Sequence, residues 1–584
     1  MASTPTGVWI SAEFHKGEYM ALRRRSTLLI ALLLVLSLVA AACGGSDEGD
    51  GEGVTGTEGQ ESELEPVEGG TLTFGAEQEP AEGLNGDLAC CTLFWQEVIF
   101  NRVLAKAYEP NPEFEYEPSP MLDGEAEVQE DPFQLTYSIN PDAVWNDGTP
   151  ITSEDFMFTI ETTLDEDNDM ASRAGYDQID VEAVEMPDEK TIVIPFTEPY
   201  AGWKDALFSP VYPAHALEGE DFNKVWQNEL VNPKNGEPIA SGPFQFESYN
   251  KGSDLTIARN EEWYGDHLAY LDEIVFQFIP DTSAEIQALR GGEVDAIYPQ
   301  PQLELVDLQT EESISIESGA GTTWEHIDFQ YGNPLLEQDF VREAIAQGID
   351  RQAIIDQLFA DINPELEPLN NMIFLNNFPD YEDHFGEYGG DPEGAIALLE
   401  ENGCTREGDD GIFECDGEPL SFGFKSTAGN ALRELTFEIA QEQLRQVGIE
   451  LESEFGDAAV VFGNQGLAGG KYDLFLFAWV GNPDPSGSVE IHKCEGTQNF
   501  QNYCNEEVTE ALEESDVTVD EEERAALLNE ADELMAEDLP ILPMYQKPTF
   551  FAFNNELQNA IDNATQQGPT WNAQDWFLSE EGAE

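Results

Sequence analysis

Basic residues are scarce in this sequence. Its 584 residues include 24 Lys and Arg against 119 Asp and Glu, which gives a formal net charge of −95. Proteins bind phosphate backbones through clustered Lys and Arg, so this composition excludes a nucleic-acid partner. The carboxylates are spread along the whole chain, as expected of a surface that stays hydrated in brine. We interpret the acidity as salt adaptation that has no bearing on the choice of ligand.

Sequence signatures of several enzyme classes are also missing. The chain has no Walker loop, no GxSxG elbow and no HExxH motif. Its six histidines lie far apart and no CxxC pair occurs, so we predict no metal site and no cofactor. The stretch Asp165–Met170 imitates the start of a calcium loop, but Met170 and Tyr176 stand where that loop requires Gly and Glu. Without a nucleophile–base motif, a hydrolase is a weak alternative.

The apolar run Leu28–Ala42 is shorter than the roughly 20 residues of a transmembrane helix. Basic residues precede it and small residues end it, which predicts a secretory signal over residues 1–42, with Met20 as the true start. The sequence around Cys43 resembles the lipobox of bacterial lipoproteins, although Ala40 stands where Leu is usual. We predict lipidation of Cys43; the alternative is an ordinary secreted protein in which Cys43 is incidental.

The residues after Cys43 predict a tether. Gly44 to Gly70 contains nine Gly and nine Asp or Glu, and neither Lys nor Arg. Such a segment buries too little apolar surface to offset the entropy of ordering. We therefore expect a disordered tether over residues 43–69 that keeps the folded part near a membrane.

Six further cysteines remain in a chain that is expected to reach an oxidising compartment. Two pairs are close enough in sequence to close local loops, namely Cys404 with Cys415 and Cys494 with Cys504. Cys90 and Cys91 are adjacent. They form either a vicinal bridge or links to other cysteines.

Strand and helix patterns alternate after Gly70. Residues 133–139, FQLTYSI, alternate apolar and polar side chains as a half-buried strand does. A turn with Gly148 follows, and Thr152 with Asp155 marks the start of a helix.

Two further units repeat this order. The strand at 274–279 leads to Thr282 and Glu285, which we read as a capping box, and the helix ends at Gly291. A helix over 431–447 passes through Gly448 into a strand at 449–455. Alternation of this kind predicts an α/β fold.

Several motifs follow one another along the chain: GGTLTFG, FQLTYSINPDAVWNDGTPITSEDFMFTIE, SGPFQFESYNKGSDLTIARNEEWYG, NPLLEQDFVREAIAQGIDRQAI, YDLFLFAWVGNPDP and LPILPMYQKP. In their content and order these motifs resemble the family 5 solute-binding proteins of ABC importers, which include oligopeptide, dipeptide and nickel receptors. One departure is Asn140, where the family commonly has Lys or Arg.

The resemblance implies a periplasmic-binding-protein type II fold of cluster C. In this fold two α/β lobes close like a Venus flytrap around a cleft, and one lobe carries an extra small domain. We assign residues 70–105, 238–320 and 541–584 to lobe I, 106–237 to the small domain and 321–540 to lobe II. Ligand binding is expected to close the lobes about a hinge.

The resemblance also implies ligand contacts near the Trp motif. Peptide-binding members hold the peptide's α-ammonium with an Asp three residues after the Trp; here Trp479 is followed by Asn482. A neutral amide cannot form that ion pair. We expect Asp484 to replace the missing Asp from a shifted position in the loop. The structural alternatives are core packing for Trp479 and a turn before Pro485 for Asp484.

Three aromatic residues are weaker candidates for the cleft. Trp324 lies just before the segment that matches the start of lobe II, and an ordinary loop is the alternative reading. Phe94 and Trp95 fall in an early loop that the family turns toward its ligand, although aromatic residues usually belong to the core.

These features predict a monomeric substrate-binding lipoprotein of an ABC importer that catalyses no reaction. Its partners would be a peptide or peptide-like solute, the membrane permease and its ATPase subunits. Its place would be the cell surface, lipid-anchored to the outer face of the cytoplasmic membrane. A non-peptide solute, such as a metal chelate, an oligosaccharide or an opine, is the alternative ligand within the same fold.

Salt adaptation predicts the behaviour of residues 43–584 in solution. We expect the melting temperature to rise as NaCl increases from dilute buffer to molar concentration, because salt screens the repulsion among the carboxylates. Thermal unfolding followed by circular dichroism measures this. A melting temperature that does not change over this range would contradict salt adaptation.

Overall fold

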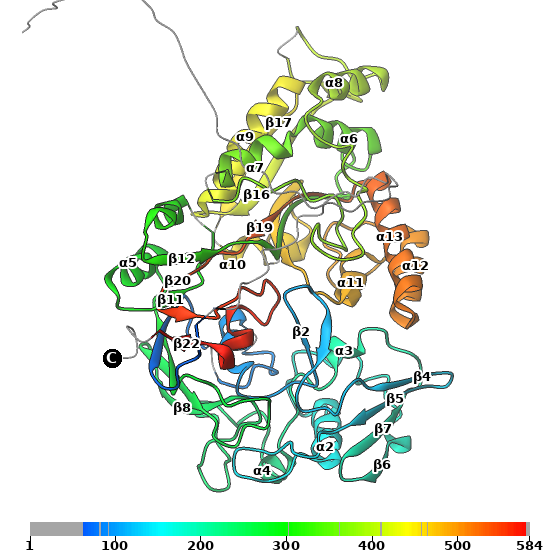
Figure 1. Cartoon of the computed structure of the whole chain (residues 1–584). Helices are drawn as coiled ribbons and strands as arrows, with labels where there is room; N and C mark the ends of the chain where they lie inside the picture. The colour runs from blue at the N-terminus through cyan, green and yellow to red at the C-terminus, as the bar shows by residue number, and fades with distance from the viewer. Residues whose placement is uncertain are drawn as a thin grey trace, which may run out of the picture. The chain divides into compact units, whose positions relative to one another are not determined.

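The structure is a computed structural model, shown in Figure 1. It describes residues 62, 64–80, 83–91, 93–301, 303–360, 362–408, 411–456, 458–463 and 465–579. The predicted signal segment and Cys43 lie outside these residues. In the part of the chain that is described, no helix has the length and apolar character needed to cross a membrane.

A seven-stranded sheet, which we call the first sheet, has the order β12-β20-β11-β1-β10-β9-β8. Its strands are β1 (Thr71–Ala76), β8 (Phe244–Asn250), β9 (Asp254–Arg259), β10 (Glu273–Phe278), β11 (Ala296–Ile297), β12 (Ile314–Glu317) and β20 (Phe551–Asn554). Central β1 pairs in parallel with both β10 and β11, and helix α5 (Thr282–Gly291) connects those two strands. Helix α1 (Phe94–Phe100) follows β1 in the chain.

A five-stranded sheet, the second sheet, has the order β17-β16-β18-β13-β19. Its strands are β13 (Ala320–Phe329), β16 (Ser421–Thr427), β17 (Glu450–Gly456), β18 (Leu474–Val480) and β19 (Ile541–Pro548). The helices of this part are α6 (Asp339–Gly348), α7 (Arg351–Phe359), α8 (Pro392–Glu401), α9 (Ala431–Val447), α10 (Ala458–Val461), α11 (Ser488–His492), α12 (Glu506–Val517) and α13 (Glu521–Asp538). Figure 1 shows α6 to α9 around the upper part of this sheet.

The small domain has a sheet of its own, with the order β4-β5-β7-β6. Its elements are β2 (Tyr108–Pro110), β3 (Tyr116–Pro118), β4 (Glu127–Glu130), β5 (Phe133–Ser138), α2 (Ser153–Leu164), β6 (Glu185–Asp188), β7 (Thr191–Pro195), α3 (Trp203–Ala206) and α4 (Ala214–Leu217). Short pairs β14 (Glu414–Cys415) with β15 (Glu418–Pro419) and β21 (Leu557–Gln558) with β22 (Phe577–Leu578) complete the strands.

Two large hydrophobic cores follow the division into sheets only in part. One core includes Phe74, Trp145 and Trp576 and joins the first sheet to the small domain. The other includes Ile327 and Tyr545 of the second sheet and extends to Ile297 and Ala552 of the first. Among the described residues, the small domain therefore has its own sheet but shares its core with the first sheet.

The boundary at residue 541 differs from the expectation. Residues 541–584 were expected in lobe I, but β19 pairs antiparallel with β13 in the second sheet. The chain returns to the first sheet only at β20. The strand pattern alone does not reveal which sheet a strand joins, because pairing partners lie far away in sequence.

The described end of the predicted tether also contacts the fold. Ser62 donates its backbone N–H to the side chain of Asn559 at 2.8 Å, and Gly69 donates to the carbonyl of Tyr270 at 2.8 Å. The ordered contacts therefore begin inside the range 43–69 rather than at residue 70.

Local expectations about helix ends are confirmed in two places and wrong in one. Thr152 and Asp155 form the capping box of α2. Gly448 ends α9 in the left-handed conformation, with φ of 100°. At α5, however, the N-cap is Asp281 rather than Thr282, and its side chain accepts from the N–H of Ala284 at 2.9 Å. Glu285, the expected partner in that box, is buried instead.

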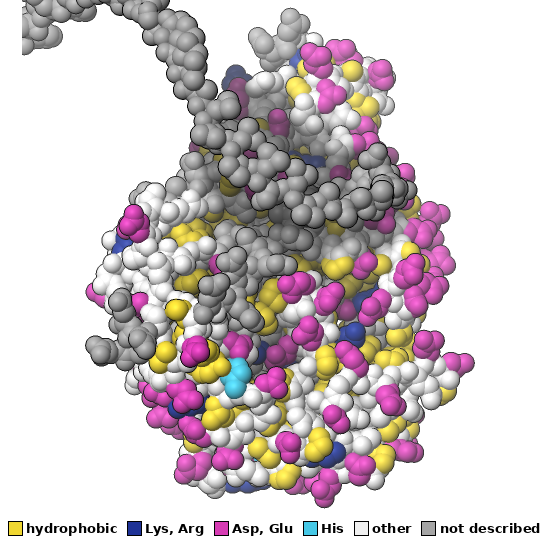
Figure 2. Space-filling view, in the orientation of Figure 1, with side chains coloured by type: hydrophobic (Ala, Val, Ile, Leu, Met, Phe, Trp, Pro, Cys, Tyr) yellow, Lys and Arg dark blue, Asp and Glu magenta, His cyan; other side chains and the backbone are white. Residues whose placement is uncertain are grey.

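Among the described residues there are three disulfides, Cys404–Cys415, Cys494–Cys504 and Cys90–Cys91. The adjacent cysteines therefore form the vicinal bridge, one of the two options that their spacing left open. Acidic side chains are spread over the face of the molecule seen in Figure 2, and few Lys or Arg interrupt them.

Candidate functional site

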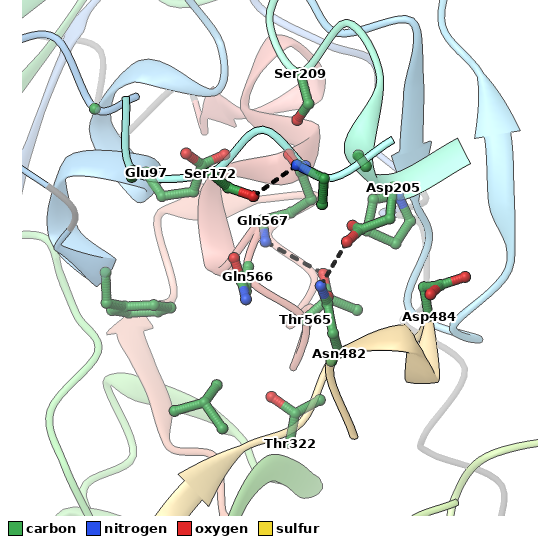
Figure 3. Close-up of a pocket in the computed structure, with 18 of the residues that line it drawn as sticks. Glu97, Ser172, Asp205, Ser209, Thr322, Asn482, Asp484, Thr565, Gln566 and Gln567 are labelled. Atoms are coloured by element: carbon green, nitrogen blue, oxygen red, sulfur yellow. Dashed lines mark hydrogen bonds between the residues drawn. The ribbon is translucent and has the colours of Figure 1, made fainter. Parts of the chain in front are cut away.

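A cavity of about 1010 Å³ lies where the first sheet, the second sheet and the small domain meet. Its walls include α1, the loop 170–178, α3, the start of β13 and the ends of β18 and β19. Ligand pockets for small molecules are commonly about 300–1,000 Å³, so this cavity is at the upper end of that range. Figure 3 shows side chains from these elements pointing into one space.

The charges of the cavity wall are mixed. Six carboxylates and two lysines are among the described lining residues: Asp87, Glu97, Asp205, Asp484, Glu490, Asp516, Lys106 and Lys547. This ratio of three to one is lower than the ratio of about five to one in the whole chain. The excess of carboxylates in the wall therefore does not indicate which ligand the cavity binds. The ion pairs of each charged side chain have to be considered one by one.

Asp484 is already neutralised within the protein. Arg524 of α13 contacts its two carboxylate oxygens at 2.9 and 3.1 Å, and Asp484 also accepts from the N–H of Ser486 at 2.9 Å. Burial would raise the pKa of Asp484, but the pairing with Arg524 outweighs burial and lowers the pKa below its ordinary value. The proposed substitution of Asp484 for the missing Asp is thus wrong in one respect: this carboxylate already has a cation.

Asp484 also has the local role that its position before Pro485 suggested. It is the N-cap of a short 3-10 helix, η4 (Pro485–Gly487). The turn and the ion pair with Arg524 fix the segment that follows β18, and this segment carries Asn482.

Asp205 of α3 has no such cation. Its two oxygens accept hydrogen bonds from the hydroxyl of Tyr116 at 2.7 Å and the amide of Asn482 at 2.8 Å. No basic side chain among the described residues forms an ion pair with it. Burial, together with the nearby charge of Asp484, raises the pKa of Asp205 to about 6.

The contact between Asn482 and Asp205 joins opposite walls, as Figure 3 shows. Asn482 follows β18 of the second sheet, whereas Asp205 belongs to the small domain. Two other contacts lie nearby: Ala201 donates its N–H to the carbonyl of Asp516 at 2.8 Å, and Lys204 lies 3.3 Å from Glu521. The small domain and the second-sheet part therefore meet directly beside the cavity.

The lysines of the wall each contact a glutamate. Lys106 pairs with Glu97 on the α1 side, and Lys547 of β19 pairs with Glu325 at 2.8 Å. Among the described residues, no group of three or more His, Cys, Asp or Glu side chains is arranged to hold a metal ion.

Three of the six predicted ligand contacts line the cavity, namely Phe94, Asn482 and Asp484. The ring of Phe94 is stacked on Tyr298 with centroids 6.1 Å apart. The start of α1 and the segment after β18 therefore lie at the cavity, and a role of these residues in ligand binding stays a prediction.

The three predicted tryptophans do not line this cavity. Trp95 packs against Phe74 in the first core, and Trp324 is buried in the second. Trp479 packs against the second core with its ring stacked on Phe500 at 6.2 Å. For Trp95 and Trp479 this is the core packing noted as the alternative. For Trp324 the noted alternative, an ordinary loop, is also wrong, because Trp324 is a buried residue of strand β13.

Asp205, Tyr116, Arg524 and Lys547 were missed by sequence reasoning. Asp205 is separated from Asn482 by 277 residues, and no spacing rule links them. Lys547 and Arg524 had a usable signal, because only 24 Lys and Arg occur in the chain. Each basic residue in such a sequence is worth examining as a partner of a buried carboxylate.

Comparisons with known proteins place this chain in a family. Residues 117–499 match the model of the family described as bacterial extracellular solute-binding proteins, family 5. The oligopeptide-binding protein OppA of Mycobacterium tuberculosis is 29% identical over 437 residues, which cover 73% of this chain and 71% of that protein. The oligopeptide-binding protein AppA of Bacillus subtilis is 22% identical over 572 residues, covering 96% and 100%.

Solved structures show the same fold. A periplasmic EDTA-binding protein, EppA, superposes with a TM-score of 0.78 at 26% identity, over 88% of this chain and 97% of that one. Bacillus subtilis AppA in complex with a nonapeptide superposes with a TM-score of 0.69 at 20% identity, over 88% and 100%. The α/β fold is that of the cluster C periplasmic binding proteins. This chain therefore belongs to family 5 of the bacterial extracellular solute-binding proteins, the substrate-binding proteins of ABC importers, which bind their solutes without catalysing a reaction.

Proposed function

We propose that the cavity captures peptides or peptide-like solutes that carry a cationic amino group and that the protein delivers them to the membrane permease and ATPase subunits of its importer. The observation that carries this proposal is the state of Asp205. It is a buried carboxylate with two neutral hydrogen-bond donors and, among the described residues, no basic partner.

The energetics of Asp205 favour a cationic ligand. A buried carboxylate without a counter-charge is unfavourable, which is the reason for its raised pKa. A ligand ammonium beside Asp205 would supply the missing charge through a charge-assisted hydrogen bond, typically about 1.5–3 kcal/mol. The carboxylate that the family pattern has at position 482 would thus be replaced by Asp205 on the opposite wall.

The same contact supports closure of the protein around its solute. Asp205 and Asn482 come from two sides of the cavity, so a group bound between them would touch both sides at once. Contacts of this kind exist only in the closed state, and a ligand that makes them shifts the equilibrium toward closure.

Curated relatives support a peptide, and one structure supports a second candidate. Proteins named as oligopeptide-binding are similar to this chain over most of its length. The EDTA-binding protein, at 26% identity, favours a metal chelate as the alternative. A polyanionic chelate would have to approach Asp205, which forms no ion pair with a basic side chain among the described residues, and this disfavours it.

We further propose that Cys43 anchors the protein by a lipid to the outer face of the cytoplasmic membrane and that the binding protein is a monomer. The support is the sequence pattern alone, because Cys43 lies outside the described residues.

The class of ligand can be tested by native mass spectrometry of protein purified from its own cells. We expect a series of masses that matches short peptides, released when the protein is denatured. One discrete mass that corresponds to a metal chelate or a sugar would contradict the peptide proposal and favour the alternative.

Replacing Asp205 with Asn should stabilise the ligand-free protein. Because the folded pKa is raised to about 6, the folded state binds this proton more tightly than the unfolded chain, and stability falls as pH rises from about 4 to about 6. At pH 7.5 Asp205→Asn should therefore raise the free energy of unfolding by roughly 1–3 kcal/mol. Urea unfolding at pH 7.5 and pH 4 measures this. The gain should vanish at the lower pH, and a loss of stability at pH 7.5 would refute the assignment of an uncompensated charge.

The same substitution should weaken binding. For tripeptides with a free α-ammonium, Asp205→Asn should raise the Kd by about 10- to 100-fold, the equivalent of one charge-assisted hydrogen bond. N-acetylated versions of the same peptides should bind both proteins with similar Kd values. Isothermal titration calorimetry measures both series.

Asp295→Asn is the matched control. Like Asp205, Asp295 has a pKa that burial raises, and it accepts a hydrogen bond, here from the backbone N–H of Thr73 at 2.8 Å, but it does not line the cavity. Its variant should bind as the unmodified protein does. Equal losses in the two variants would show that the effect of Asp205 is not specific to the site.

A further inference from the structure

Glu325 of β13 is contacted by two cations. Its carboxylate is buried, with 1% of the side chain exposed. Arg433 of α9 contacts it through Nε, 3.1 Å from each oxygen, and through Nη2 at 3.0 Å. Lys547 contacts the same carboxylate through Nζ at 2.8 Å.

The cluster of Glu325, Arg433 and Lys547 contains one more positive charge than negative charges. Burial would raise the pKa of Glu325, but Lys547 and Arg433 lower it below the ordinary value, so the carboxylate is ionised. One negative charge faces two positive ones, and the fork of Arg433 is sufficient to neutralise Glu325. The neighbours of the cluster are neutral: Thr427 accepts from Arg433 at 3.0 Å, and Tyr545 lies close by as a phenol.

Lys547 lies at the wall of the cavity, whereas Glu325 and Arg433 lie behind it. An ammonium has three N–H donors. Among the contacts of the described residues, Glu325 is the partner of Nζ, and 12% of the lysine side chain remains exposed. The surplus charge of the cluster is therefore presented to the cavity by Lys547.

The backbone geometry holds this lysine close to the neighbouring strand. A side chain at Gly321 of β13 would place its Cβ 2.6 Å from the carbonyl oxygen of Lys547, so only glycine fits there. Gly321, Thr322 and Thr323 line the cavity beside Lys547. The backbone of Lys547 is thus held against β13, and its ammonium is positioned by the pair with Glu325.

We propose that Lys547 binds the carboxylate of the solute, and that this group is the C-terminal carboxylate of a peptide. The inference rests on the proposed function and names the second charged end of the same ligand. Asp205 of the small domain faces the cationic end, and Lys547 of the second sheet faces the anionic end. A solute with one charge at each end, a short zwitterionic peptide, satisfies both residues.

The experiment compares peptides that differ only at the C-terminus. A set of tri- to pentapeptides is prepared with a free carboxylate and with a carboxamide, and the Kd of each is measured by calorimetry at a NaCl concentration at which the protein is folded. For the unmodified protein we expect the carboxylate form to bind at least about 10-fold more tightly, the effect of one charge-assisted contact.

Three variants locate the effect. Lys547→Met should reduce the ratio of amide Kd to acid Kd to about one, and Lys547→Arg should retain most of it. The matched control is Lys425→Met: Lys425 has a similarly covered side chain, 13% exposed, and pairs with Glu454 at 3.2 Å, but it does not line the cavity. This control should keep the full ratio.

The outcomes separate the two proposals. Equal binding of acid and amide by the unmodified protein, or an unchanged ratio in Lys547→Met, would overturn the carboxylate site and leave peptide capture intact. Binding of neither peptide form would overturn peptide capture and, with it, this site. If Lys547→Met does not fold, the ratios in the unmodified protein and in Lys547→Arg decide: retention of the preference by both supports the proposal, and its absence from the unmodified protein overturns it.

Discussion

The ion pair between Asp484 and Arg524 determines which of two neighbouring carboxylates in the cavity wall, Asp484 or Asp205, has a basic partner among the described residues. With Arg524 in place, Asp484 stays ionised and is satisfied within the protein. Its charge still acts on Asp205 and, together with burial, raises the pKa of that carboxyl. Asp484 is thus neutralised by Arg524, while Asp205 forms no ion pair among the described residues. In the proposed function, Asp205 takes the role of the Asp that the family pattern has at position 482.

The two walls of the cavity differ in the sign of the charge that they leave unpaired. On the small-domain side this is Asp205, and on the second-sheet side it is the cluster of Glu325, Arg433 and Lys547. A ligand that neutralises both walls must touch both parts of the protein. Recognition and closure are then the same event, because each charge of the solute gains its partner only when the parts approach.

The sequence predicted local structure well wherever the cause of the structure was local. The alternation in β5, the capping box at Thr152 and the glycine that ends α9 all depend on residues a few positions apart. At α5 two neighbouring residues competed for the cap, and the spacing rule selected Thr282 although Asp281 has the better geometry. The family resemblance, rather than the periodicity, supplied the two-lobed fold.

The site was predicted only in part, because its defining contacts are long-range. Asn482 and Phe94 were found through motifs that line the cavity. The tryptophans were chosen for their chemistry, yet a motif gives no information about which side of a helix or strand faces the core. Asp205 lies in the segment WKDALF, where nothing distinguishes it from the other 118 acidic residues until the fold places it against Asn482.

The large net charge of the chain does not explain how the cavity selects a charged solute. At about 1 M salt the Debye length is only about 3 Å. The net charge of −95 of the whole chain would therefore not attract a cationic solute from a distance. Pairs that are buried away from water are screened far less. Selection must then depend on the few covered charges that lack a counter-charge of their own. Asp205 forms no ion pair among the described residues, and Lys547 shares Glu325 with Arg433. In a protein with so acidic a surface, a specific site for an anion requires a cation that the fold shields, and the shared glutamate behind Lys547 fixes that cation in place.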